Sequence, residues 1–309
     1  MSTQSPSAAC GSGTIAGQPS HVRLYALLTL MVFFWALNFV IARVALRYFP
    51  ALLAASLRAL IAGLLLLPLY IWKGREFDHE PWTRKDIPTL LLLGVTGVTF
   101  NQVLFLLGLE RTSTPHAAIM TGIMPLQVLA LSALSGLERL NGLRLAGMGL
   151  ALSGVGVLQT SRSAGTNATL LGDFLVLLSG TAFAAFAVIG KKLTAKHGGL
   201  TINTFAFLGG GLTLLPVIAW ESLTFSYSRV TPAGWLSLLY MAAFPSAVAY
   251  LIFYYALTYI PASRVGSFSY LQPIMATILG VLLLGDHITS ALVAGGALVL
   301  GGVFLTERG

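Results

Sequence analysis

The stretch TGIMPLQ at residues 121–127 decides the fold of this chain, together with a second stretch, SYLQP, at residues 269–273. Each places a proline, Pro125 or Pro273, inside a long apolar run. A proline inside a helix removes one backbone hydrogen bond and clashes with the carbonyl four residues earlier, so the helix kinks. The sequence therefore predicts two kinked helices, with Pro125 and Pro273 as their hinges.

The residues four positions before these prolines are Thr121 and Ser269, and their carbonyls are the ones that the kinks would free. Both side chains carry a hydroxyl group, which can help to re-satisfy a broken backbone inside a membrane. The two prolines stand 148 residues apart, and this offset recurs along the chain.

The composition is that of an integral membrane protein. Of 309 residues, 56% are hydrophobic and only 9% are charged, and the mean hydropathy is +0.83. A soluble globule of this size needs more polar surface. The single cysteine, Cys10, and five scattered histidines have no ligand-like spacing, so we expect no metal and no cofactor. The net charge of +8 is ordinary for a polytopic protein, and we expect no nucleic-acid partner.

Residues 1–23 are expected to form a disordered tail, because this segment is rich in small and polar residues and lacks hydrophobic periodicity. A membrane-spanning helix needs roughly 20 apolar residues. On this criterion the sequence predicts an all-α membrane protein with ten spans, at about residues 24–46, 51–72, 87–109, 115–136, 142–160, 170–190, 200–220, 233–257, 262–284 and 288–306.

The distribution of cations predicts that both termini are cytoplasmic, because Lys and Arg accumulate on that side. The segments that this orientation places inside hold Arg23, Lys73, Arg75, Arg84, Lys85, Arg139, Arg144, Lys191, Lys192, Lys196, Arg264 and Arg308. The outer segments hold only Arg43, Arg47, Arg111, Arg162 and Arg229.

The offset of 148 residues predicts an internal repeat. It pairs Pro68 with Pro216, Trp72 with Trp220, and Glu138 with Asp286 without a gap. The first repeat is predicted at 24–160 with spans 1–5, and the second at 170–306 with spans 6–10. Residues 161–169 are then a linker and 307–309 a C-terminal tail. An odd number of spans per repeat places the two repeats in opposite orientations across the membrane.

The residues that carry a family resemblance are Trp35 to Val40 with Arg43, and the stretch from Pro125 through Glu138-Arg139-Leu140 into Gly147 and Gly154. With their copies around Pro273, Asp286, Gly295 and Gly302, they resemble the two EamA-type repeats of the drug/metabolite transporter superfamily. The resemblance implies a ten-helix carrier of the bacterial inner membrane. It also implies export of metabolites, amino acids or toxic compounds through a cavity between the repeats.

All ten acidic residues fall at predicted helix ends or in loops, so no carboxylate is expected at the midplane. A proton-coupled antiporter often uses a buried acid, and its absence favours a facilitator, an exchanger or coupling through another group. The sequence also shows no acid pair, Ser-His dyad or metal cluster for an enzyme. Glu138 and Asp286 are expected to end their helices at the interface.

The deepest cation is Arg58, about one-third into its span. It needs a partner such as a backbone carbonyl or a cavity, and two interpretations stay open. Arg58 is either a structural residue or a contact for an anionic or carboxylate-bearing substrate.

Polar side chains inside the spans are the candidates for substrate binding, because an amide in hydrocarbon is costly unless it faces a partner or a water-filled cavity. They are Asn38, Asn101, Gln102, Thr121, Gln127, Asn203, Ser269 and Gln272. Hydrogen bonding between helices is an equally good explanation for any one of them. Gln127 and Gln272 are favoured because each stands within two residues of a hinge proline.

Aromatic residues form a second group of candidates. Tyr250 and Tyr254 share one helical face, and Tyr270 stands beside the second hinge. They are expected to line a pocket for flat or apolar substrates, or to anchor helices at the membrane interface. The motifs Gly149-xxx-Ser153 and Ala297-xxx-Gly301 are expected to pack the fifth and tenth spans against neighbours, in a monomer or a homodimer.

The sequence therefore predicts a secondary transporter that exports small organic metabolites, such as amino acids, by alternating access. The partners expected are a small-molecule substrate and the lipid bilayer. The alternative is a membrane-embedded enzyme or a scaffold that transports nothing. An enzyme needs a convergent reactive group, which the sequence lacks, and a scaffold does not need paired prolines with nearby amides.

Overall fold

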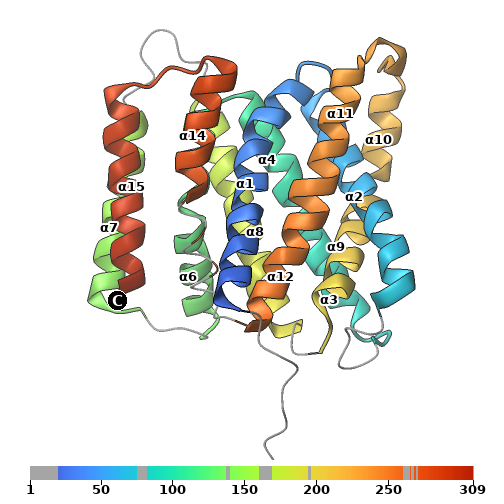
Figure 1. The fold of residues 1–309 in the computed structure, drawn as a ribbon, viewed down its shortest axis with the longest axis horizontal. Coiled ribbons are helices and arrows are strands. Elements are labelled where there is room, and N and C mark those ends of the chain that lie inside the picture. The colour runs from blue at the N-terminus through green and yellow to red at the C-terminus, as the bar shows by residue number, and fades with distance from the viewer. Residues whose placement is uncertain are drawn as a thin grey trace, which may run out of the picture.

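The computed structural model describes residues 20–74, 82–136, 140–159, 169–193, 196–259, 265, 268 and 271–308. Every regular element in this part of the chain is helical, which confirms the predicted all-α class. Figure 1 shows the helices standing side by side in one bundle, with the N-terminal end of α1 at the bottom and the loop between α14 and α15 at the top.

The elements follow the predicted spans closely, and several spans contain more than one element. They are α1 (His21–Ala45), α2 (Ala51–Lys73), α3 (Ile87–Leu93), η2 (Gly94–Phe100), α4 (Asn101–Glu110), α5 (Thr114–Thr121), α6 (Met124–Leu134), α7 (Gly142–Gln159), α8 (Leu170–Leu193), α9 (Gly199–Thr213), α10 (Leu215–Ser222), η4 (Tyr227–Arg229), α11 (Pro232–Met241), η5 (Ala242–Val248), α12 (Ala249–Tyr259), α14 (Leu271–Leu284) and α15 (Ser290–Arg308).

Within the described residues, six helical stretches are long and apolar enough to cross a membrane. The bent pair α9–α10 makes a seventh. Three further apolar helices are shorter, at Gly142–Val157, Leu271–Leu284 and Ser290–Thr306. The protein is therefore a multi-pass membrane protein. The structure confirms six or seven of the ten predicted spans, and the count of ten stays a prediction.

The predicted hinge at Pro125 lies at a break, although not inside a continuous helix. α5 ends at Thr121, and α6 begins at Met124 with Pro125 in its first turn. Proline is tolerated there because the first amide groups of a helix have no intrahelical acceptor. The Thr121 hydroxyl donates to the carbonyl of Ala117 at 2.9 Å. The second predicted hinge, Pro273, is the third residue of α14. Ser269 and Tyr270, which precede this helix, lie outside the described residues.

The strongest bend is elsewhere. α9 and α10 meet at 43° around Leu214, just before Pro216. Pro216 matches Pro68 at the repeat offset, yet Pro68 lies inside the uninterrupted helix α2. The repeat match between Pro68 and Pro216 therefore did not show which of the two prolines lies at a break between helices.

Two π-helices lie at matching positions of the two repeats. η2 covers Gly94–Phe100 and η5 covers Ala242–Val248, and both ends of η5 stand 148 residues after those of η2. Pro245 lies inside η5, and Gly97 takes the matching position in η2. A π-helix inside an α-helix is rare and often lies at a functional site. Neither irregularity was predicted.

Contacts between α7 and α15 show a twofold relationship between the repeats. A Cβ added to Gly147 would meet the carbonyl oxygen of Gly302 at 2.5 Å, and one added to Gly154 would meet that of Gly295 at 2.7 Å. Gly147 matches Gly295, and Gly154 matches Gly302, at the repeat offset. Exchanging the repeats therefore exchanges the two contacts, as a twofold axis requires.

The fifth and tenth segments do pack through small residues, but the contacts within the chain are made by Gly147, Gly154, Gly295 and Gly302. A Cβ on Gly149 or Gly301 would have no described atom of this chain within 4 Å, so the packing role of these two glycines stays a prediction. Figure 1 shows α7 and α15 side by side at one edge of the bundle.

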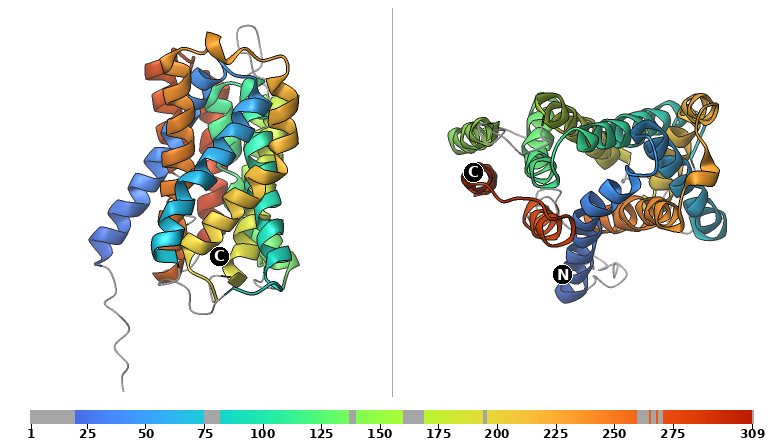
Figure 2. Two further views of the ribbon diagram at one scale, coloured as in Figure 1. Left: turned by 90° about the vertical axis from the view of Figure 1, so that its right-hand side faces the viewer. Right: turned by 90° about the horizontal axis from the view of Figure 1, so that it is seen from above.

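The two ends of the bundle are closed by different chemistry. At the upper end, Phe49 contacts the rings of Phe225 and Trp235, with centroids 5.6 Å and 5.3 Å apart. At the lower end, the buried His197 lies 3.8 Å from Asp86. Hydrogen bonds from the backbone and hydroxyl of Thr83 lower the pKa of Asp86. Figure 2 shows the bundle from the side and from above, with the N-terminal end of α1 at its lower end.

Candidate functional site

A small central cavity lies where the two repeats meet. Its volume is about 70 Å³, and residues from α1, α2, α4, α5, α6, α8 and α14 line it. The lining residues are Trp35, Asn38, Phe39, Arg58, Asn101, Phe105, Thr121, Met124, Ser179, Gly180, Phe183 and Gln272. Five candidates from the sequence, including Arg58, are therefore brought together although they span more than two hundred positions of the chain.

Arg58 projects from α2 into this region and is only 4% exposed. Its Nε donates to the carbonyl of Met241 at 3.1 Å and to the hydroxyl of Ser246 at 2.9 Å. Its Nη1 is buried and has no hydrogen-bond partner among the described residues. Arg58 thus has structural contacts on one side of the guanidinium, and its contact with a substrate stays a prediction.

Pro245 explains why Arg58 finds an acceptor in the middle of a span. A proline at this position cannot donate to the carbonyl of Met241, four residues earlier, so that carbonyl loses its α-helical partner. Arg58 and the hydroxyl of Ser246 both bond it. The carbonyl of Pro245 in turn accepts from the indole N–H of Trp35 at 3.0 Å. The irregular helix η5 therefore holds two side chains that line the central cavity.

The amides in the cavity differ in their contacts. Asn101 donates to the carbonyl of Ser179 at 3.0 Å, which joins α4 to α8. Asn38 is 5% exposed, and its Oδ1 has no hydrogen-bond partner in the described part of the chain. Gln272 is buried on α14, next to Pro273 in the chain. A Cβ added to Gly122, the residue after Thr121, would lie 3.4 Å from the ring of Pro273. The two hinge regions thus approach each other beside the cavity.

Other candidates do not line the cavity. Gln127 donates to the carbonyl of Leu177 at 2.8 Å and to the hydroxyl of Thr181 at 3.0 Å, so its amide joins α6 to α8. Gln102 and Asn203 are buried and are not among the residues that line the cavity. Ser269 and Tyr270 lie outside the described residues.

Tyr250 and Tyr254 belong to a packed aromatic cluster behind the cavity. Tyr250 meets the rings of Trp35 and Phe183, both cavity residues, with centroids 6.0 Å and 5.9 Å apart. Tyr254 is 1% exposed and contacts Phe186. Edge-to-face pairs of this kind add rigidity beyond the buried area. In this conformation the tyrosines support the cavity wall and do not form its surface.

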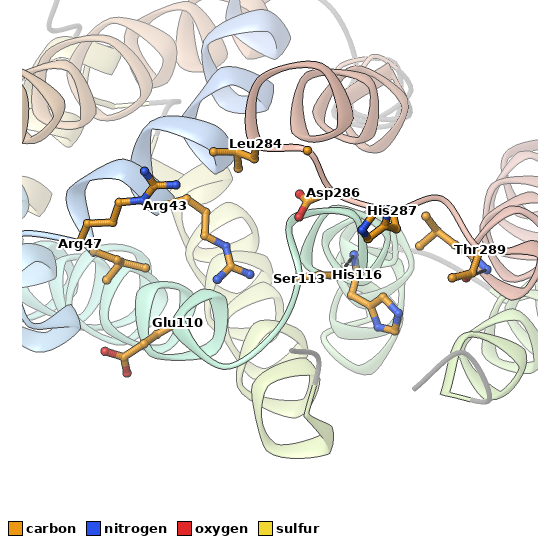
Figure 3. Close-up of a pocket in the computed structure, with 12 residues that line it drawn as sticks. Arg43, Arg47, Glu110, Ser113, His116, Leu284, Asp286, His287 and Thr289 are labelled. Atoms are coloured by element: carbon orange, nitrogen blue, oxygen red, sulfur yellow. Dashed lines mark hydrogen bonds between the residues drawn. The ribbon is translucent and has the colours of Figure 1, made fainter. Parts of the chain in front are cut away.

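A larger upper cavity lies nearer the end of the bundle where α1 finishes. Its volume is about 350 Å³, and Figure 3 shows the side chains around it. Arg43 comes from α1 and Arg47 from the turn after it, while Asp286 and His287 come from the loop after α14. Gly285, with φ of +72°, ends α14, and the amide of Asp286 bonds the carbonyl of Gly280. Asp286 therefore stands at a helix end, and its side chain also lines this cavity.

The two cavities lie one above the other along the same helices. Phe39 lines the central cavity and Arg43 the upper one, four residues further along α1, or about 6 Å. On α5, Thr121 lines the central cavity and His116, five residues earlier, lines the upper one. The buried side chains of Ile119 and Met120 lie on the intervening turn of α5. One layer of the protein thus separates the cavities.

Sequence reasoning missed three residues of this region. Pro245 stands inside a predicted span and is followed by Ser246. A proline with a nearby hydroxyl residue is the same kind of pattern that led to the prediction at Pro125, so the sequence could have revealed Pro245 as well. His116 and Asp173 are buried together, with Nδ1 and Oδ2 3.3 Å apart. They are 57 residues apart in the chain, and no local pattern relates them.

Comparisons with known proteins agree with this architecture. A sequence model of the EamA-like transporter family matches residues 23–160 and again residues 170–308. The chain belongs to the EamA-like transporter family. The resemblance found in the sequence is confirmed, and the protein is a membrane transporter of that family.

Among curated proteins, the chain is 30% identical over 270 residues to an uncharacterized transporter of Bacillus subtilis, YetK, covering 86% of this chain and 81% of that protein. It is 26% identical over 281 residues to a protein of Streptantibioticus cattleyicolor named a probable terminal-alkyne amino-acid exporter, covering 91% and 92%. A solved crystal structure with 18% identity shares the fold, with a TM-score of 0.64 over 93% of this chain and 96% of that one.

Proposed function

We propose that this protein exports small organic metabolites that carry a carboxylate, such as amino acids or related compounds. The observation that carries the proposal is the central cavity, where Asn38, Arg58, Asn101, Thr121 and Gln272 converge from both repeats. Arg58 offers a buried donor there, and a carboxylate is the group that an arginine fork binds best. The Streptantibioticus relative, named as an amino-acid exporter, supports the same class of substrate.

Transport would proceed by alternating access. The layer between the two cavities and the contacts that close each end of the bundle are the parts that must open and close. The twofold relationship of α7 and α15 supports two repeats that exchange roles between outward-facing and inward-facing states. With a cavity volume of about 70 Å³, the present conformation is too small to hold a whole amino acid and corresponds to a closed state.

We further propose that the three shorter apolar helices complete ten spans in two inverted repeats, in a bacterial inner membrane with both termini in the cytoplasm. The upper cavity then opens to the outside. This arrangement divides the chain into a tail at 1–23, a first repeat at 24–160 and a second repeat at 170–306. The alternatives of an enzyme or a scaffold are disfavoured, because the family and its relatives are named as transporters.

The test is counterflow in proteoliposomes loaded with a panel of unlabelled solutes, which requires no driving gradient. We expect uptake of labelled L-amino acids and weaker uptake of the amines that lack their carboxylate. A clear preference for the amines would contradict the role given to Arg58. Absence of flux across the whole panel would favour the scaffold.

A further inference from the structure

The upper cavity has the size of a solute-binding site and shares no lining residue with the central cavity. Its volume is about 350 Å³, against about 70 Å³ for the central cavity. Ligand pockets in proteins usually measure about 300–1,000 Å³. The upper cavity can therefore hold a small organic solute in the present conformation, although the substrate contacts assigned to the central cavity make no use of it.

One wall of the upper cavity carries two cations. Arg43 stands in the last turn of α1 and Arg47 in the turn that follows, and Figure 3 shows both side chains on the same side of the cavity. The two guanidinium groups are close enough to repel each other. A guanidinium group binds a carboxylate through two parallel N–H donors. A carboxylate bound between Arg43 and Arg47 would therefore also relieve their repulsion.

The facing wall carries a carboxylate that the fold holds in place. Asp286 follows Gly285, whose φ of +72° ends α14. The Oδ2 atom of Asp286 is buried, and a Cβ added to Gly280 on α14 would lie 2.8 Å from it. Glu110 also lines the cavity, but Arg111 engages that carboxylate at 2.6 Å. Asp286 is therefore the carboxylate that remains for a cationic group of a ligand.

The charges on the two walls attract each other without forming a salt bridge. Arg43 and Asp286 interact electrostatically, yet no ion pair joins them among the described residues. A ligand that carries both charges can bridge such a gap between opposite walls. Apolar lining is provided by Leu46, Leu284 and Leu292, which can contact the uncharged part of the ligand.

We propose that the upper cavity is a second solute site, which binds α-amino acids as zwitterions. The α-carboxylate lies between Arg43 and Arg47, the α-ammonium group contacts Asp286, and an aliphatic side chain packs against the leucines. The inference rests on the proposed function and narrows its substrate class from carboxylate-bearing solutes to zwitterions. On export, the carboxylate passes from Arg58 in the central cavity to Arg43 and Arg47, so an arginine is available on both sides of the closed layer.

The requirement for both charges follows from the walls. A carboxylic acid without the ammonium group satisfies the arginines but meets the like charge of Asp286. An amine without the carboxylate satisfies Asp286 but meets the like charges of Arg43 and Arg47. Because the cavity is open to water, each missing partner should weaken binding by about fivefold, the upper range for an exposed ion pair.

The experiment measures how solutes protect a cysteine placed in the upper cavity. Full-length protein in lipid nanodiscs carries His287→Cys, at an exposed lining residue with no role in the proposed contacts. It also carries Cys10→Ser, which removes the single native cysteine, and Arg58→Met, which disables the central cavity. The rate of labelling by a charged thiol reagent is then followed with L-leucine, with isocaproate, which lacks its ammonium group, and with isoamylamine, which lacks its carboxylate.

We expect L-leucine to protect the cysteine with an apparent affinity about fivefold higher than that of either analogue. Asp286→Asn should abolish the advantage of L-leucine over isocaproate. The double change Arg43→Gln with Arg47→Gln should abolish its advantage over isoamylamine. Glu221→Gln on α10 and Arg229→Gln on η4 are the matched controls outside both cavities, and both advantages should persist in them.

Equal protection by the three solutes, or protection by none of them, would overturn the proposal. If the charge variants fail to fold, the comparison of the three solutes still decides the question, because it leaves Arg43, Arg47 and Asp286 unchanged. The proposed function has its own readout, the counterflow of wild-type protein. Counterflow without protection of the cysteine overturns the second site alone, whereas absence of counterflow contradicts the proposed function.

Discussion

The Nε atom of Arg58 donates to the carbonyl of Met241, the acceptor that stands four residues before Pro245. These residues are 183 positions apart. The proline removes the α-helical donor of this carbonyl and Arg58 bonds it, so the irregular backbone of one span holds the buried cation of another. This relationship predicts how changes at either position affect folding and transport.

Arg58→Met should reduce transport by at least about tenfold, because it removes the donor available in the central cavity. It should also lower stability by about 2 kcal/mol, the scale of hydrogen bonds from a charged group. Arg58→Lys should keep the charge and lose the fork geometry, so transport should recover only in part. Counterflow and thermal unfolding in detergent measure the two effects. Full transport by Arg58→Met would remove Arg58 from the substrate site.

Pro245→Ala restores an amide donor for Met241, in competition with Arg58 and Ser246. We expect η5 to shift toward regular α-helix, with a loss of transport of several-fold and little change in stability. Pro68→Ala is the matched control, because Pro68 is exposed inside an uninterrupted helix. Equal effects of the two substitutions on transport would show that the π-helix has no special role.

Asn38→Ala and Asn101→Ala should separate substrate contact from helix packing. Asn38 Oδ1 has no partner in the described part of the chain, so its removal should leave stability unchanged while transport falls. Asn101 bonds the carbonyl of Ser179, so its loss should lower stability by about 1 kcal/mol in addition. Rates per folded molecule and unfolding temperatures are the measurements. A large loss of stability in Asn38→Ala would assign it a packing role.

Gln127→Ala should act through stability. Its amide bonds both Leu177 and Thr181 on α8, and the loss of these bonds should cost about 1–2 kcal/mol. Transport per folded molecule should stay within about twofold of wild type. If transport is lost while the unfolding temperature is unchanged, Gln127 contacts the substrate, as the sequence predicted.

Gly154→Val should destabilise the packing of α7 on α15 by about 1–3 kcal/mol, the usual cost of overpacking. A Cβ there would meet the carbonyl oxygen of Gly295 at 2.7 Å and the amide nitrogen of Val299 at 2.8 Å. Gly156→Val is the control on the same helix, since a Cβ at Gly156 would have no atom of the described residues within 4 Å. Thermal unfolding of the two variants should differ clearly; similar values would indicate that α7 and α15 separate without cost.

The amino-acid sequence by itself determined the helical class, the membrane location, the repeat offset and the polar residues Asn38, Arg58, Asn101, Thr121 and Gln272 of the central cavity. These features are local, because apolar length, residue pattern and the cost of a polar group in hydrocarbon can be read from each segment alone. The tertiary structure decided which amides line the cavity and which join helices, as Gln127 shows. It also decided that Pro245 supports Arg58 and that His116 meets Asp173. Burial and pairing depend on which segments pack together, and a single span does not contain that information.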